Sequence, residues 1–176
     1  CQNGTEPTIT FTGAGGTAPY TFTYSIDNGS GPVVQAPVTT VSGNSRTINV
    51  PTTVAGTFRY ALVNVQEGST ASCSQAQTGF VDVLVRPLPG ATITGATEVC
   101  VNAPSPSITF TGSNGVAPYI FHYRINSGPI QTIVTTVGNT VTVAVPTTGT
   151  GTFTYELVDV QESSTNSCLR TFTPAS

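Results

Sequence analysis

The chain is an internal duplication, and this repeat constrains the fold more than any other feature of the sequence. Residues 9–13 read ITFTG, and the same five letters recur at residues 108–112. After a loop that is shorter in the second copy, the pattern of residues 62–73 recurs at residues 157–168, and both stretches end on a cysteine. Two copies of one unit therefore fill the 176 residues. We expect a first domain at residues 1–88 and a second at 89–176.

Within each copy, apolar residues alternate with polar ones in short runs bounded by Gly, Pro and Asn, which is typical of β-strands. In the second copy the alternation predicts strands at about residues 91–95, 107–111, 119–125, 130–137, 140–145 and 152–160. The first copy supplies a seventh at about residues 79–86, and we expect a bulge near Leu62, where the alternation changes face. Seven strands in about 95 residues are typical of an immunoglobulin-like sandwich. The expected fold class is all-β, with two tandem immunoglobulin-like β-sandwich domains.

Each copy lacks a strand that the other possesses. The run at residues 91–95 precedes Cys100, but no equivalent precedes Cys1; the run at residues 79–86 follows Cys73, but no equivalent follows Cys168. We therefore expect the first domain to lack its first strand and the second to lack its last. We therefore interpret the chain as a window from a longer tandem array.

Charged residues are scarce. They make up 7% of the chain, against roughly 25% in an ordinary soluble domain, and lysine does not occur. The net charge of -3 comes without a basic block, which argues against nucleic acid as a partner. No apolar run reaches the length of about 18 residues that a membrane-spanning helix needs, so membrane insertion is not expected.

Four cysteines, Cys1, Cys73, Cys100 and Cys168, allow three pairings. Because the repeat matches Cys1 with Cys100 and Cys73 with Cys168, we predict one bridge within each copy, Cys1–Cys73 and Cys100–Cys168. A Cys73–Cys100 bridge between the copies remains the alternative. Lipid attachment at Cys1 is disfavoured, because this residue corresponds to an internal cysteine. Disulfides indicate an oxidising compartment, and therefore a secreted or cell-surface protein.

No catalytic residue is expected, and we interpret the chain as a non-enzyme. The one histidine, His122, corresponds to Thr23 in the first copy and falls on the outward face of a predicted strand. A catalytic triad therefore cannot be built in both copies. A closed zinc site is also unsupported, because the cysteines show no CxxC spacing and one histidine is available.

The recurring carboxylates raise calcium as the one cofactor to weigh. Asn64 and Glu67 in the first copy correspond to Asp159 and Glu162 in the second. Calcium takes six to eight oxygen ligands, and no calcium-binding loop of the DxDxDG type occurs. We therefore expect no cofactor, and calcium held between units remains the alternative.

Several motifs of the second copy together resemble a known repeat type. PSITFTG at residues 106–112, APYIFHY at 117–123 and GTFTYELV at 151–158 precede the closing Cys168. They resemble the Ig-like or PKD-like tandem repeats of large secreted Bacteroidetes surface adhesins, such as SprB-type gliding-motility adhesins exported by the type IX secretion system. The resemblance covers both copies. It implies an extracellular location on the bacterial cell surface and brings no catalytic residues.

The resemblance implies structural or adhesive repeat modules that form a stalk in surface attachment or gliding motility. Their partners would be neighbouring repeats of the same chain and surface polysaccharide. The alternative is a pair of accessory carbohydrate-binding modules of a secreted polysaccharide-degrading enzyme. A row of exposed aromatic side chains would favour the alternative, but Trp is absent and most Tyr and Phe residues fall on predicted core faces.

Overall fold

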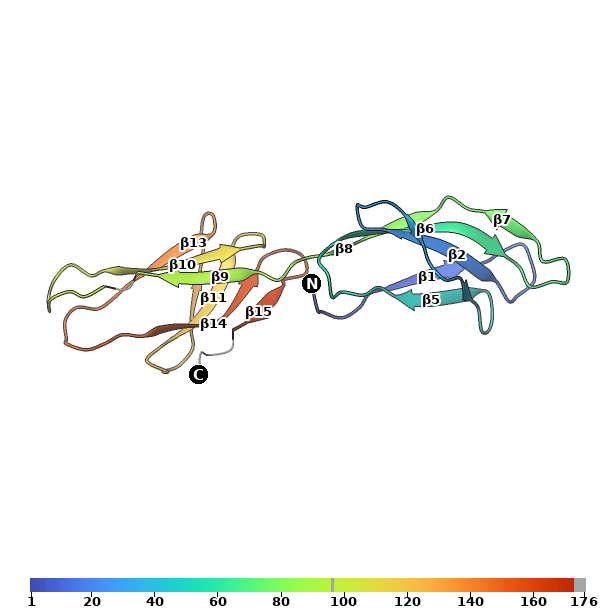
Figure 1. The fold of residues 1–176 in the computed structure, drawn as a ribbon. Coiled ribbons are helices and arrows are strands. Elements are labelled where there is room, and N and C mark those ends of the chain that lie inside the picture. Colours follow the sequence, from blue (N-terminus) through green and yellow to red (C-terminus); the bar gives the residue numbers. More distant parts are fainter. Residues whose placement is uncertain (96, 173–176) are drawn as a thin grey trace. The chain divides into compact units, whose positions relative to one another are not determined.

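The computed structural model describes residues 1–95 and 97–172, which form strands and no helix (Figure 1). The predicted all-β fold class is confirmed. The chain divides into two compact units, Cys1–Arg86 and Pro87–Ser176. All strand pairs in both units are antiparallel among the described residues.

The first unit builds two sheets from alternating strand sequences. The smaller sheet pairs β1 (Thr8–Thr12) with β5 (Ser45–Asn49). The larger sheet is centred on β2 (Thr21–Asp27) and the long β6 (Gly56–Gln66), which pair with each other. Four further strands complete the larger sheet: β3 (Val33–Val34), β4 (Val38–Thr39), β7 (Ser74–Ala76) and β8 (Phe80–Val85).

The second unit repeats this plan. One sheet has the order β13 (Thr140–Ala144), β10 (Ser107–Ser113), β9 (Gly90–Thr94). The other has the order β12 (Gln131–Val134), β11 (Tyr119–Ile125), β14 (Tyr155–Glu162), β15 (Leu169–Thr171). The short strands β7 and β15 were not predicted, because three polar or mixed residues carry no alternation signal.

The predicted bulge is confirmed, and it occurs in both units. In the first, Thr23 lies opposite Asn64 and the next residue, Tyr24, lies opposite Leu62, so one residue of β6 is unpaired. In the second, the register shifts in the same way after His122. An extra residue on one strand turns the following side chains to the other face, which explains the change in alternation.

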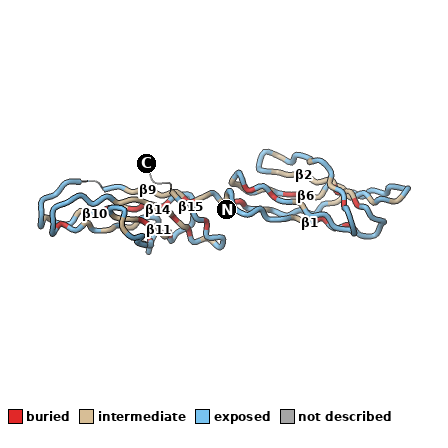
Figure 2. The backbone as a smooth tube through the Cα atoms, turned by 90° about the horizontal axis from the view of Figure 1, so that it is seen from below, coloured by how far each residue is buried: buried red, intermediate tan, exposed pale blue. Residues whose placement is uncertain are grey.

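The two sheets of each unit enclose an aromatic core, and buried segments recur along both units in Figure 2. In the first unit Phe11 of β1 and Phe22 of β2 stack with ring centroids 5.6 Å apart. In the second, Phe110 and Phe121 lie 5.7 Å apart, and both are fully buried. Since these pairs join one sheet to the other, each unit has its own sandwich core.

A buried threonine fixes the start of the central aromatic strand. In the second unit, the backbone N–H of Tyr119 donates to Oγ1 of Thr135 over 2.8 Å, and Thr135 is 2% exposed. The first unit repeats the contact between Tyr20 and Thr40 at 3.0 Å. The tyrosine hydroxyl in turn accepts a hydrogen bond from the backbone N–H of a glycine four residues earlier in each unit.

Replacing Thr135 with valine should destabilise the second unit by about 1–3 kcal/mol, because the isosteric side chain leaves the buried N–H of Tyr119 without its acceptor. Urea unfolding of the whole chain measures the change. The matched control is Thr140→Val at an exposed position of β13, where we expect a change within about 0.5 kcal/mol. Equal effects at the two positions would contradict this account of the contact.

Candidate functional site

Each unit contains one glutamate whose carboxylate accepts hydrogen bonds from three backbone N–H groups in two loops. In the second unit this residue is Glu162, which ends β14 and is 2% exposed. Its oxygens accept from the backbone N–H groups of Val116 at 3.1 Å, Ser164 at 2.9 Å and Cys168 at 2.9 Å. The Ser164 hydroxyl also donates to it. We call this arrangement the glutamate clip.

The first unit contains the same clip around Glu67. The donors are the backbone N–H groups of Thr17, Ser69 and Cys73, each at 3.1 Å, together with the Ser69 hydroxyl. A glycine makes room for the glutamate, since a Cβ at Gly16 would come within 2.9 Å of the Glu67 Cβ. The clip therefore ties the loop before the aromatic strand to the loop that leads to the second cysteine.

These donors hold both carboxyl groups in the charged form. The hydrogen bond from the Ser69 hydroxyl, followed by that from the Thr17 N–H, lowers the pKa of Glu67 to about 2. Burial raises the pKa of Glu162, but hydrogen bonds from Ser164, Cys168 and Val116 outweigh it, so that this pKa also lies below its ordinary value. A saturated, charged carboxylate of this kind stabilises the fold.

The structure separates the carboxylates on which the calcium interpretation depended. The Glu162 carboxylate accepts hydrogen bonds from the loops, as in Val116 N–H to Glu162. Asp159 instead lies on the sheet and contacts His122. Within residues 1–95 and 97–172, no group of three or more His, Cys, Asp or Glu side chains is placed to hold a metal ion. The glutamate recurs because both units need the same loop contact.

A pH titration tests the clip of the first unit. Because the pKa of Glu67 is about 2 in the folded unit, against an ordinary value of 4.5, the clip stabilises the fold fully above about pH 4.5. That contribution should fall progressively as the pH decreases from about 4.5 towards 2. Thermal unfolding of the chain and of Glu67→Gln between pH 6 and pH 2 measures it. The difference between the two proteins should shrink in acid; a constant difference would contradict the ionised clip.

His122 lies where the sequence places it, on β11, and it pairs across the sheet with Asp159 of β14. Its Nδ1 atom is 2.5 Å from Oδ1 of Asp159. The two side chains are partly buried, at 29% and 17% exposure, so His122 is less open to solvent than expected. Thr23 and Asn64 occupy the same opposed positions in the first unit. Among the described residues, no hydroxyl or thiol is hydrogen-bonded to the imidazole, and the pair forms a cross-strand contact.

The predicted pairing of cysteines within each copy is wrong in this structure. Cys73 and Cys100 are exposed free thiols, so neither Cys1–Cys73 nor Cys100–Cys168 is formed. The alternative bridge between Cys73 and Cys100 is not formed either. Cys1 and Cys168 are both disulfide-bonded.

The first unit shows the reason, because it places its two cysteines at opposite ends of β6. The N–H of Gln2, next to Cys1, donates to the carbonyl of Arg86 over 2.7 Å, beside the end of β6 where Gly56 pairs with Val85. Cys73 precedes Ser74, which pairs with the last residue of β6. Eleven residues of β6 separate these ends, or roughly 33 Å at about 3.3 Å per residue. A disulfide needs Cα atoms within about 7 Å.

Thiol counting checks this assignment. We expect two thiols per folded chain, Cys73 and Cys100, to react with a maleimide without reductant. All four should react after reduction and unfolding. Mass spectrometry of the peptides from the labelled protein identifies the sites. Labelling of Cys1 or Cys168 in the folded, unreduced protein would contradict the assignment.

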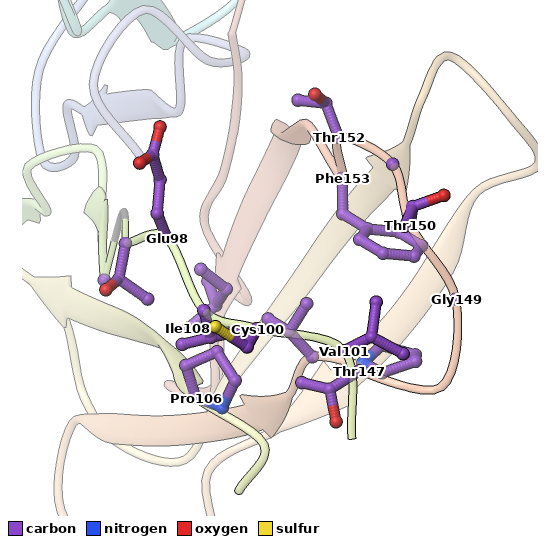
Figure 3. Close-up of a pocket in the computed structure, with 16 residues that line it drawn as sticks. Glu98, Cys100, Val101, Pro106, Ile108, Thr147, Gly149, Thr150, Thr152 and Phe153 are labelled. Carbon is purple, nitrogen blue, oxygen red and sulfur yellow. The ribbon is translucent and has the colours of Figure 1, made fainter. Parts of the chain in front are cut away.

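The second unit contains an open groove that the sequence did not reveal. Its volume is about 570 Å³, and 16 residues from 95–153 line it. Figure 3 shows the segment that carries Cys100 and Val101 on one side of the groove and Phe153 in the loop opposite. The lining is mixed, with Val101 and Phe153 among its apolar side chains.

No model of a protein family matches the chain, and neither the curated proteins nor the solved structures yield a match. The strands therefore define an all-β class without assigning a family. In the part of the chain that the structure describes, no helix has the length and apolar character needed to cross a membrane.

Proposed function

We propose that the two units are structural repeat modules of a large bacterial surface adhesin, where they form part of a stalk in surface attachment or gliding motility. The observation that supports this proposal is the pattern of what the duplication retains. Both units keep the glutamate clip and the tyrosine–threonine contact, with equivalent partners. The cross-strand pair of His122 and Asp159 on the outer face of the sheet is not kept. Retention of internal contacts with variation outside them is typical of modules whose role is to be a stable scaffold.

The chemistry of the chain supports an extracellular location for these modules. Disulfide bonding at Cys1 and Cys168 is compatible with an oxidising compartment. Ordered hydroxyl pairs cover the exposed face of the small sheet, where the Oγ1 atoms of Thr10 and Thr47 lie 2.9 Å apart. Neutral faces of this kind suit contact with neighbouring repeats better than the binding of charged ligands.

Surface labelling tests the proposal. Fab fragments raised against residues 1–176 should label intact bacteria that produce the protein, and treatment of the cells with protease should remove the signal. In-frame removal of the two units should weaken attachment to polysaccharide-coated glass or slow gliding, while export of the remaining protein continues. Labelling that requires permeabilised cells would contradict a surface location. Unchanged attachment and gliding would contradict the stalk role.

The distribution of aromatic side chains bears on the carbohydrate-binding alternative. Among the described residues, the exposed aromatic side chains are Phe80, at 60%, and Phe153, at 38%, and they belong to different units. A sugar-stacking row would need several on one face. Affinity electrophoresis of the chain in gels containing soluble polysaccharides should therefore show no retardation, and strong retardation would favour the alternative.

A further inference from the structure

The two units differ at one edge of the larger sheet. In the first unit, β8 pairs with β6 from Gly56 to Ala61, with Val85 opposite Gly56 and Val83 opposite Phe58. In the second unit, the equivalent residues 151–154 lie outside any strand and are exposed, and β14 begins at Tyr155. The sequence is not the cause, since GTF occurs at residues 56–58 and again at 151–153.

The glycine that begins the unpaired stretch has nearly the same φ as its counterpart in the first unit. Gly56 has a φ of 154°, and Gly151 has a φ of 150°. Residues 151–153 line the groove. Figure 3 shows Thr152 and Phe153 across the groove from Cys100 and Val101. In the first unit the residue that corresponds to Val101 is Gln2, whose N–H is bonded to the carbonyl of Arg86 directly after β8. The groove therefore occupies the place that β8 and Arg86 fill in the first unit.

We propose that this groove is a strand-acceptor site, which binds an extended peptide segment with the alternation of β8 as an added antiparallel strand. The proposal rests on the proposed function in one respect: the segment is supplied by a neighbouring repeat, because β8 of this chain is already paired with β6 in the first unit.

The first unit shows what such a segment needs. Val85 is 2% exposed and Val83 is partly buried, whereas Leu84 is 51% exposed. Alternate residues of the segment therefore enter the unit, and the residues between them face solvent. Backbone hydrogen bonds supply affinity in strand addition, and the alternate side chains supply specificity. In the second unit the two inward side chains would lie opposite Gly151 and Phe153.

A peptide crosslink tests the proposal on the intact chain. The probe is a peptide with the sequence of residues 79–86, GFVDVLVR, with cysteine in place of the last arginine and activated as a mixed disulfide with pyridine-2-thiol. If the peptide binds as β8 does, its cysteine lies beside Cys100, whose thiolate attacks the peptide sulfur and releases pyridine-2-thione. We expect crosslinking at Cys100 at least tenfold faster than at Cys73, which is equally a free exposed thiol.

Two matched peptides provide the controls. An inward substitution, Val85→Asp, should reduce the rate at Cys100 to that at Cys73, whereas an outward substitution, Leu84→Asp, should leave the preference for Cys100 intact. The chain without peptide, labelled with a small maleimide, corrects for intrinsic thiol reactivity. Equal corrected rates at the two thiols, or equal effects of the two substitutions, would overturn the proposal.

Discussion

Replacing Glu162 with alanine is expected to cost the second unit at least about 3 kcal/mol, because three backbone N–H donors lose their acceptor at a site that is 2% exposed. The loss should also loosen the two loops that the carboxylate joins. Urea unfolding, followed by hydrogen exchange at Val116 and Cys168, measures both effects. The first unit, with its own clip at Glu67, serves as the internal reference.

Two variants separate the clip from a general effect of charge. Glu162→Gln keeps the length of the side chain but replaces one acceptor oxygen with a donor, so we expect a loss smaller than that of the alanine variant. Glu98→Ala removes a carboxylate from an exposed position and should change stability by less than about 0.5 kcal/mol. A stability loss below about 1 kcal/mol in Glu162→Ala would contradict a stabilising clip.

Replacing Gly112 with alanine is expected to cost the second unit about 3 kcal/mol, at the upper end of the range for overpacking. A Cβ at this position would lie 2.5 Å from the ring of Tyr119. The ring is 3% exposed, and its hydroxyl accepts a hydrogen bond from the Gly115 N–H, so it has little freedom to move away. Thermal and urea unfolding of the whole chain measure the loss.

The same close approach occurs in the first unit, where a Cβ at Gly13 would lie 2.4 Å from the ring of Tyr20. We expect Gly13→Ala to destabilise that unit similarly. Gly149→Ala is the control, because a Cβ there meets no heavy atom within 4 Å and its φ is not in the left-handed region. Equal stability of Gly112→Ala and Gly149→Ala would show that the tyrosine ring has room to shift.

The strands could be predicted from the sequence because alternation is a local signal. The bulge after Thr23 was also predictable, since an extra residue changes which side chains face the core. The start of β14 was not predictable, because a strand forms where a partner strand is present. Residues 152–154 are hydrogen-bonded to Asn126 but pair with no strand among the described residues. The alternation placed the start of this strand at residue 152, but pairing with a neighbouring strand begins three residues later, at Tyr155.

The cysteine pairing and the glutamate clip show where sequence reasoning fails. The repeat matches Cys1 with Cys100, but it does not reveal that Cys1 and Cys73 lie at opposite ends of β6. The recurrence of Glu67 as Glu162 was a usable signal. Its partners are mainly backbone N–H groups. Every residue except proline carries such a group, so the sequence does not reveal these partners. The carboxylates alone therefore raised a metal site as the interpretation.

Single-molecule pulling tests the central claim, that each copy is an autonomous structural module whose stability comes from its own sandwich core. With reductant present and the chain held by its two ends, we predict two separate unfolding events, each releasing roughly 300 Å of chain, at about 3.5 Å per residue for units of 86 and 90 residues. Glu162→Ala should lower the force of one event and leave the other unchanged. A single event that releases the whole chain, or extension without resistance in reductant, would contradict the claim.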